Sequence, residues 1–274
     1  MNDVSLVITS CGRFDLLERT LDSFFKYNTY PIKEVIITED STEGKKLEKL
    51  VSKYKDQNFK LIVNETRIGQ IKSIDKAYKE VKTEYVFHCE DDWEFLRKGF
   101  IEKSMDMLKE DPKIAVVGLR SREDCSGIPI SKENYKASNG EEYFEILEDV
   151  FTYNPGLRRK DVCDLFGSHE KLEGKLWEAE LSKFYKDRGF KMISFVNPFV
   201  EHIGNKRHVH FSKRGKNSVL DFKIDRMVKK IRYTFLKLFG KLCDKKTIPS
   251  NFINIEHNLQ LSLLEGFLCG DGTK

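Results

Sequence analysis

Apolar runs of strand length alternate with amphipathic segments along the first 118 residues of the chain. The runs are continuous, as in strands that are buried on both faces of a parallel sheet. The segments between them repeat apolar residues at helical spacing. This pattern indicates an α/β fold with an open, doubly wound, mostly parallel twisted sheet flanked by helices. The expected strands are Val4–Thr9, Glu34–Thr38, Lys60–Val63, Tyr85–Cys89 and Ile114–Gly118, and the expected helices are Phe14–Tyr27, Lys45–Lys55, Gln70–Val81 and Lys98–Leu108.

The regular pattern changes after residue 118. Residues 121–148 are rich in Gly, Pro, Ser and charge, which indicates a surface insertion, and the Asn-Pro-Gly-Leu segment at 154–157 is typical of a turn. A helix is expected from about Glu173 to Arg188, followed by a strand in FKMISFV. We expect one domain over residues 1–220, with halves at 1–118 and 119–220, and a helical C-terminal extension over 221–274.

Composition narrows the class of protein. The chain is 39% hydrophobic, and 48 Lys and Arg against 44 Asp and Glu leave a net charge of +4, which is too balanced to favour nucleic acid as a partner. The apolar run Val4–Ile8 lacks the basic preface and cleavage site of a signal peptide, and no run approaches the roughly 18 residues of a membrane helix. Six scattered cysteines fit a reducing compartment. We expect a soluble, cytoplasmic protein.

Polar side chains follow each of the first four predicted strands. The carboxyl ends of parallel strands lie at one edge of a sheet, where open α/β folds bind ligands. Loops and helix starts are polar in any protein, so one residue alone carries little weight, whereas the whole set favours a binding site. Its members are Thr9, Ser10, Arg13, Asp40, Arg67, Gln70, Glu90, Asp91 and Asp92.

Three consecutive acids, Glu90, Asp91 and Asp92, follow the fourth strand in the segment EYVFHCEDDWEF. Such a run is either a solvated turn or a set of oxygen ligands for a hard divalent cation such as Mg²⁺ or Mn²⁺. Here an apolar strand precedes the acids, and Trp93 and Phe95 follow them. Repulsion among carboxylates beside apolar groups would raise their pKa values unless a cation compensates it. We therefore favour a site for a metal or a metal–phosphate group.

Four segments, VITSCGR, VIITEDS, RIGQIKSIDKAY and YVFHCEDDWEF, resemble in this order the family 2 glycosyltransferases of the GT-A fold. The resemblance covers about Val4 to Gly204, and EDD corresponds to the D-x-D signature of that family. It implies a GT-A catalytic domain whose first half binds a nucleotide-diphosphate sugar and whose second half binds the acceptor. It also implies that Asp92 ligates Mn²⁺ or Mg²⁺, while Glu90 and Asp91 face the ribose and the diphosphate.

The resemblance also assigns the earlier strand ends. Thr9, Arg13 and Asp40 match positions that line the nucleoside pocket, and the aspartate would accept a hydrogen bond from the base. Arg67 precedes a helix whose backbone amides near Gln70 would face phosphate oxygens.

One segment departs from the family pattern. Many relatives carry an Ala-Arg-Asn run in the third helix, where this chain has Ser73, Ile74 and Asp75. Lys72 either supplies the lost positive charge or is a solvated helix residue. The departure leaves the nucleobase open.

Glycosyl transfer also needs a base that removes the proton of the attacking hydroxyl. In inverting members of the family this base is a carboxylate at the start of a helix that ends in Gly, an aromatic residue and a basic one. The segment LWEAELSKFYKDRGFKM is similar to that pattern and places Glu178 at the base position, with Glu180 as the alternative. Both acids also fit the solvated start of an ordinary helix. Some GT-A enzymes retain configuration with similar acids, so retention stays open.

A histidine often completes the metal shell shortly after this strand in metal-dependent GT-A enzymes, and His202 is at the matching place. His208 and His210 alternate along the chain, but no further ligands stand at a spacing typical of zinc. A basic stretch follows at Lys206, Arg207, Lys213, Arg214 and Lys216. It is either a solvated loop or a lid that closes over the diphosphate.

The sequence therefore predicts a metal-dependent inverting glycosyltransferase that moves a sugar from a nucleotide-diphosphate sugar to a hydroxyl of a glycan or glycoconjugate. A sugar-phosphate nucleotidyltransferase is the nearer alternative, although ITSCGRFD has one glycine and no glycine-rich phosphate loop. The other alternative is a non-catalytic module that binds through the basic helix in 221–274. That helix either contacts an anionic membrane peripherally or packs on the catalytic domain or on a second copy in a homodimer.

Overall fold

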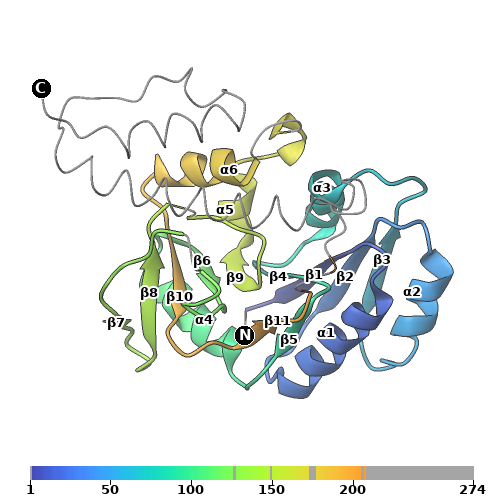
Figure 1. Ribbon diagram of the computed structural model, residues 1–274, viewed down its shortest axis with the longest axis horizontal. Coiled ribbons are helices and arrows are strands. Elements are labelled where there is room, and N and C mark those ends of the chain that lie inside the picture. Colours follow the sequence, from blue (N-terminus) through green and yellow to red (C-terminus); the bar gives the residue numbers. More distant parts are fainter. Residues whose placement is uncertain (1, 126–127, 149, 173–176, 205–206, 208–274) are drawn as a thin grey trace, which may run out of the picture. The chain divides into compact units, whose positions relative to one another are not determined.

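The computed structural model describes residues 2–125, 128–148, 150–172, 177–204 and 207. Their centre is a sheet in the strand order β3-β2-β1-β4-β9-β6-β10-β8-β7, and a separate pair joins β5 and β11. Helices cover both faces of the main sheet, with α3, α5 and α6 on one face and α1, α2 and α4 on the other (Figure 1). This is the expected open α/β sheet. The predictions for residues 221–274 lie outside the described residues.

The first half of the chain follows the predicted alternation closely. Parallel pairs join β1 to β2, β1 to β4 and β2 to β3, and β6 lies further along the sheet. The observed strands are β1 (Val4–Ser10), β2 (Glu34–Glu39), β3 (Phe59–Val63), β4 (Tyr85–Glu90) and β6 (Ile114–Gly118). The observed helices are α1 (Phe14–Tyr27), α2 (Gly44–Val51), α3 (Gln70–Glu80) and α4 (Phe100–Glu110).

Continuous burial explains the apolar strand runs. All seven residues of β1 are buried, and its side chains alternate between two cores, with Leu6 in one and Val7 in the other. On the α1 face, Phe24 is fully buried, and its ring packs against those of Phe87 and Phe95. Burying one such side chain contributes about 1.5–3 kcal/mol to stability. The two cores hold the sheet rigidly, so the loops at its carboxyl edge have fixed starting points.

The segment expected to be a turn at 154–157 is partly a strand, and that prediction was wrong. Gly156 begins β9 (Gly156–Arg159), which runs antiparallel between β4 and β6 in the middle of the sheet. A Cβ atom at Gly156 would lie 2.6 Å from the carbonyl oxygen of Val117. The glycine is therefore required because the two strands approach too closely for any side chain.

The expected surface insertion at 121–148 also contains sheet structure. Within it, β8 (Glu142–Ile146) pairs antiparallel with β10 (Lys191–Phe195), and β7 (Tyr135–Lys136) pairs with β8. Phe144 on β8 is fully buried. The prediction of a surface insertion missed these strands because the segment alternates apolar and charged residues only briefly.

The remaining elements of the second half follow β9 along the chain. They are α5 (Lys160–Asp164), a 3₁₀ turn η1 (His169–Leu172), α6 (Trp177–Lys186), β10, and β11 (Val200–His202), which pairs with β5 (Trp93–Phe95). The α6 helix and the β10 strand confirm the two predicted elements in this region. In the part of the chain that the structure describes, no helix is both long and apolar enough to cross a membrane.

Candidate functional site

The carboxyl ends of β1, β2 and β4 meet at a cavity of about 350 Å³. Every site residue predicted at the strand ends lines it, together with His202 from β11. The residues around it are Thr9, Ser10, Cys11, Arg13, Asp40, Arg67, Gly69, Gln70, Ser73, Glu90, Asp91, Asp92, Trp93, Arg120, Asp124, Asn154 and His202. The structure thus brings the predicted set together in one place.

Glu39, which the sequence reasoning did not select, shapes the first loop of the site. Its side chain is fully buried at the end of β2. The carboxylate accepts hydrogen bonds from the Ser10 hydroxyl at 2.7 Å and from the backbone amides of Gly12 and Ser41, each at 2.8 Å. Glu39 therefore connects the loop after β1 to the loop after β2 through hydrogen bonds. In the sequence, the adjacent acids Glu39 and Asp40 in TEDS were the pattern that could have identified Glu39.

Asp40 organises the loop that precedes α3. One carboxylate oxygen accepts hydrogen bonds from the Asn64 side-chain amide at 2.9 Å and the Ile68 amide at 2.8 Å, and the other accepts one from the Gly69 amide at 2.8 Å. Gly69 has a φ of 91°, a conformation that glycine adopts without strain. The two amides that directly precede α3 thus bind a protein carboxylate, and the predicted contacts of the amides near Gln70 with phosphate and of Asp40 with a base stay predictions.

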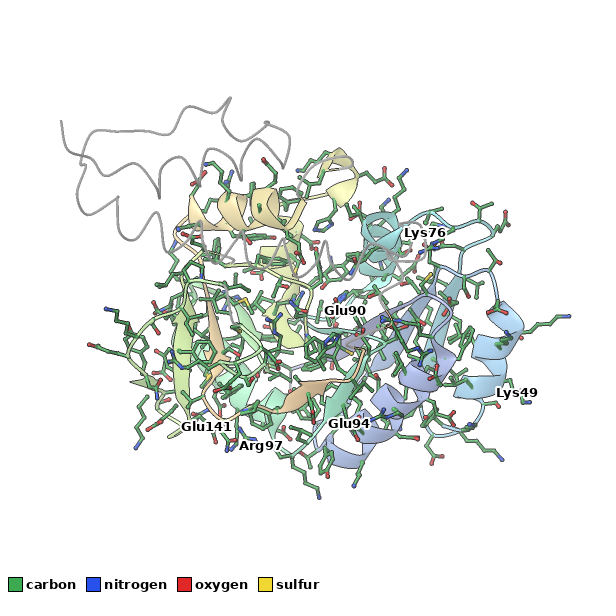
Figure 2. The ribbon with its side chains drawn as sticks, in the orientation of Figure 1. Lys49, Lys76, Glu90, Glu94, Arg97 and Glu141 are labelled. Carbon is green, nitrogen blue, oxygen red and sulfur yellow. The ribbon has the colours of Figure 1, made fainter. Side chains whose placement is uncertain are left out.

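The three acids after β4 differ in their surroundings. Glu90 accepts a hydrogen bond from the indole nitrogen of Trp93 at 2.8 Å. Burial and, to a smaller extent, the charge of Asp92 raise the pKa of Glu90 to about 8, while the bond from Trp93 opposes the shift. Glu90 lies among the central elements in Figure 2, whereas Lys49 extends outward from α2.

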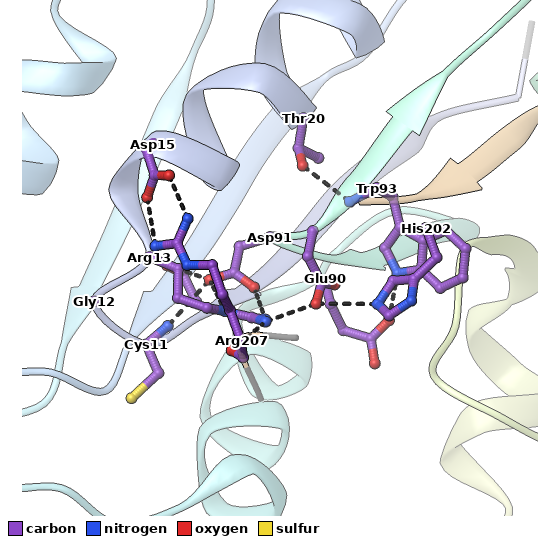
Figure 3. A network of polar contacts seen from close by, with 12 residues as sticks. Cys11, Gly12, Arg13, Asp15, Thr20, Glu90, Asp91, Trp93, His202 and Arg207 are labelled. Atoms are coloured by element: carbon purple, nitrogen blue, oxygen red, sulfur yellow. Dashed lines mark hydrogen bonds and ion pairs between the residues drawn. The ribbon is translucent and has the colours of Figure 1, made fainter. Parts of the chain in front are cut away.

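Asp91 forms an ion pair with Arg13, and its side chain is 1% exposed. The Asp91 carboxylate also accepts hydrogen bonds from the Ser10 hydroxyl at 3.2 Å and from the Cys11 amide at 3.4 Å. Figure 3 shows the Arg13 guanidinium directed at this carboxylate. Burial raises the pKa of Asp91 to about 6, although the charge of Arg13 acts to lower it.

Asp92 is the acid that meets His202. Its Oδ2 atom lies 3.2 Å from His202 Nε2 and 2.7 Å from Arg13 Nη1. Burial alone would raise the pKa of Asp92, but the hydrogen bond with His202 and the charge of Arg13 together lower it below its ordinary value. The carboxylate fits closely against the backbone, because a Cβ atom on Gly204 would lie 2.2 Å from Oδ2.

Strand pairing explains why a histidine 110 residues away reaches this acid. In the antiparallel pair of β11 with β5, His202 stands opposite Trp93, and the two rings pack with their centroids 4.7 Å apart. The Ile203 amide then donates a hydrogen bond to the Asp92 carbonyl at 2.9 Å. The β5–β11 pair therefore sets the position of the imidazole.

Asp92 and His202 fit as two ligands of a divalent ion. A carboxylate oxygen and an imidazole nitrogen are both ligands that Mn²⁺ accepts, and their atoms already converge. Within the described ranges, no group of three or more His, Cys, Asp or Glu side chains is arranged to hold a metal.

Glu178 lies on α6 and lines a second cavity of about 130 Å³. The two cavities share Arg120 and Asn154, and the charge of Glu178 contributes to the raised pKa of Glu90. Glu180, the alternative base, is exposed on the same helix and is not among the lining residues. Arg120 follows the carboxyl end of β6, and this position was the signal in the sequence that could have identified it.

A buried polar network behind the cavity was missed as well. The Asp75 carboxylate on α3 accepts hydrogen bonds from the Ser168 hydroxyl at 2.6 Å and from the backbone amide of His169 at 2.8 Å, and it pairs with the His169 imidazole. The other imidazole nitrogen is hydrogen-bonded to the Tyr153 hydroxyl. The signal in the sequence was Asp75 itself, at the place where the chain departs from the family run.

The mostly parallel central sheet flanked by helices is the fold of the GT-A glycosyltransferases. The model of the family described as glycosyl transferase family 2 matches residues 5–164, and the chain belongs to that family. It is a glycosyltransferase. No curated protein sequence matches the chain.

Solved structures of GT-A glycosyltransferases share the fold. The mannosyltransferase PcManGT from Pyrobaculum calidifontis, in complex with GDP-Man and Mn²⁺, is 14% identical with a TM-score of 0.59, over 92% of this chain and 69% of that one. GalNAc-T7 with UDP, GalNAc and Mn²⁺ is 13% identical with a TM-score of 0.56, over 74% and 44%. Residues 1–349 of S. aureus TarS, in complex with UDP, are 18% identical with a TM-score of 0.54, over 72% and 59%. This chain thus spans about two thirds of the first of these chains and less of the other two.

Proposed function

We propose that the chain is a metal-dependent inverting glycosyltransferase that uses a nucleotide-diphosphate sugar. The observation that carries this proposal is the convergence of Asp92 and His202, 3.2 Å apart, at the cavity where the strand ends meet. Similar structures hold UDP or GDP-Man, and two of them hold Mn²⁺. The family assignment favours this reaction over the nucleotidyltransferase alternative.

The donor would occupy the larger cavity. Thr9, Arg13 and Asp40, which line it, would surround the nucleoside, and Arg67 and the amides near Gln70 would face the diphosphate. Glu90 and Asp91 would face the ribose and the diphosphate. Asp92 and His202 would hold Mn²⁺ or Mg²⁺, which when bound stabilises the negative charge that develops on the leaving nucleoside diphosphate.

Glu178 is the proposed catalytic base. It lines the second cavity, and the two cavities meet at Arg120 and Asn154, so an acceptor placed there would stand beside the donor. The carboxylate would take the proton of the acceptor hydroxyl while that oxygen attacks the anomeric carbon, and the nucleoside diphosphate leaves from the opposite side. A single displacement of this kind inverts the configuration. The acceptor is proposed to be a hydroxyl of a glycan or glycoconjugate.

A thermal-shift screen tests the donor site directly. Nucleoside diphosphates and their sugars are added one at a time, each with and without Mn²⁺. We expect a rise in melting temperature only when the nucleotide and the metal are present together, because each completes the binding site of the other. A protein whose melting temperature does not respond to any combination would contradict the proposal, and the responding base identifies the donor.

A further inference from the structure

Arg13 bridges Asp91 and Asp92, and Asp92 is the acid that is expected to bind the metal. Its guanidinium forms ion pairs with both Asp91 and Asp92, and the Nη1 nitrogen lies 2.7 Å from Asp92 Oδ2. The Arg13 side chain is 15% exposed, so most of it lies inside the protein. Two neighbouring carboxylates in a cleft repel each other, and a guanidinium that bridges them removes that repulsion.

Three separate parts of the chain hold Arg13 in this orientation. Arg13 itself precedes the first residue of α1, and the two acids follow β4. From the segment after β11, the Arg207 carbonyl accepts a hydrogen bond from Arg13 Nη1 at 3.3 Å. The Arg207 guanidinium in turn pairs with Asp15 on α1, with one N–O distance of 2.9 Å. Figure 3 shows these side chains together at the edge of the site.

One carboxylate oxygen is shared between the arginine and the predicted metal position. Asp92 Oδ2 is the atom that contacts both Arg13 Nη1 and His202 Nε2. A divalent ion held by Asp92 and His202 would need that oxygen, and it would come to lie next to a guanidinium. The divalent ion and the Arg13 guanidinium are both positively charged, so as neighbours they would repel each other strongly in a partly buried site.

We propose that Arg13 is an internal counter-cation that keeps the Asp91–Asp92 pair from binding a divalent ion until a diphosphate arrives. The diphosphate then offers Arg13 new oxygen partners, to which a planar guanidinium bonds in pairs, and Asp92 Oδ2 becomes available to the metal. The free protein consequently binds the metal weakly, and metal and donor enter as one complex. This inference rests on the proposed function, since it assumes a site for both the metal and the diphosphate.

The test measures Mn²⁺ binding without any transfer reaction. Free Mn²⁺ is followed by electron paramagnetic resonance, and the melting temperature is recorded in parallel. The proteins are the wild type, Arg13→Gln, Arg13→Lys and the control Arg19→Gln. Arg19 pairs with Glu94 on the surface, where its side chain is 54% exposed, and it does not line the cavity.

We expect Arg13→Gln to bind Mn²⁺ at least about 10-fold more tightly than the wild type in the absence of nucleotide, because the competing positive charge is gone. Mn²⁺ alone should then raise the melting temperature of this variant but not that of the wild type or Arg19→Gln. In the wild type, a nucleoside diphosphate together with Mn²⁺ should restore tight metal binding. Arg13→Lys keeps one charge without the planar fork and should fall between the two.

Equal Mn²⁺ affinity in the wild type and Arg13→Gln, each without nucleotide, would overturn the inference and leave the proposed function standing. Absence of Mn²⁺ binding in every protein, with or without nucleoside diphosphate, would overturn the metal-dependent function as well. If Arg13→Gln does not fold, Arg13→Lys decides the question. A lysine variant with tighter Mn²⁺ binding than the wild type supports the inference, and one with unchanged binding refutes it.

Discussion

The buried acids at the cavity and the buried Asp75 on α3 differ in how their charges are compensated. At the cavity, Glu90 accepts a hydrogen bond from Trp93, and burial raises its pKa to about 8. Behind α3, burial would also raise the pKa of Asp75, but hydrogen bonds from His169 and Ser168 outweigh it and lower the pKa to about 2. Hydrogen-bond donors within the protein therefore compensate the negative charge of Asp75.

The difference separates a functional site from a structural one. A buried carboxylate that already accepts several hydrogen bonds is not stabilised further by a cation. The hydrogen bonds of Asp75 therefore have a structural role, because they join α3 to η1. At the cavity, Asp91 and Asp92 share the single Arg13, and the pKa values of Glu90 and Asp91 stay raised, so this group of acids is less fully compensated and can accept a further cation. Four predictions use this contrast, in decreasing order of the expected effect.

Asp92→Asn should reduce transfer by about 10³-fold or more, because it removes a proposed metal ligand and the charge that holds it. The fold should persist, since an amide of the same shape still fits against Gly204. Initial rates with Mn²⁺ and the donor found by the thermal-shift screen measure this effect. Glu94→Gln, two residues along and exposed, is the matched control and should retain wild-type rates. Full activity in Asp92→Asn would remove this acid from the metal site.

Glu178→Gln should lower kcat by about 10²-fold while donor binding stays unchanged, because the amide cannot accept the proton of the acceptor hydroxyl. Rates are compared with the donor affinity obtained from thermal shifts. Glu180→Gln on the same helix is the control. A large loss in Glu180→Gln together with normal rates in Glu178→Gln would reverse the assignment of the base.

Asp75→Asn should lower the free energy of unfolding by roughly 2–4 kcal/mol, because it breaks a buried, hydrogen-bonded ion pair with His169. Urea denaturation measures the loss. Asp187→Asn removes an exposed acid that pairs with Lys183, and it should change the same quantity by less than about 0.5 kcal/mol. Similar losses in both variants would mean that the buried network contributes no more than a surface pair does.

The stabilisation from Asp75 should depend on pH in a defined window. Its pKa is about 2 in the folded state and about 3.9 in an unfolded chain, so the contribution is present above about pH 4 and is lost as the pH falls toward 2. The difference in unfolding free energy between wild type and Asp75→Asn should therefore shrink by about 2 kcal/mol over that range. Denaturation curves at pH 5, 4 and 3 follow it, and a difference that stays constant would contradict the lowered pKa.

The sequence predicted the first half of the fold well because its information is local. Each strand from β1 to β4 is an apolar run, and each helix between them repeats its own periodicity. The second half was predicted less well because its elements depend on contacts between residues that are distant in the sequence. β9 begins at the glycine of a Pro-Gly pair that is typical of a turn, and its place between β4 and β6 is set by strands some 40 to 70 residues away.

The same division holds for the site. The order of the strands at one edge of the sheet let the sequence identify the residues that line the cavity, and the acid run indicated a cation. The sequence did not indicate which charges meet. It did not indicate that Arg13 bridges two acids or that Asp40 binds the amides before α3, while the expected contacts of both residues with a nucleotide stay predictions.

By itself, then, the sequence determined the alternation of elements, the edge at which polar residues gather, and membership of a family whose members carry acids at that edge. Only the tertiary structure decided the partners of each charge. Hydrophobic periodicity acts over a few residues, whereas an ion pair such as Arg13 with Asp91 joins residues 78 positions apart. Its formation depends on the strand register and on burial, which lowers the dielectric around both groups and makes their pairing favourable.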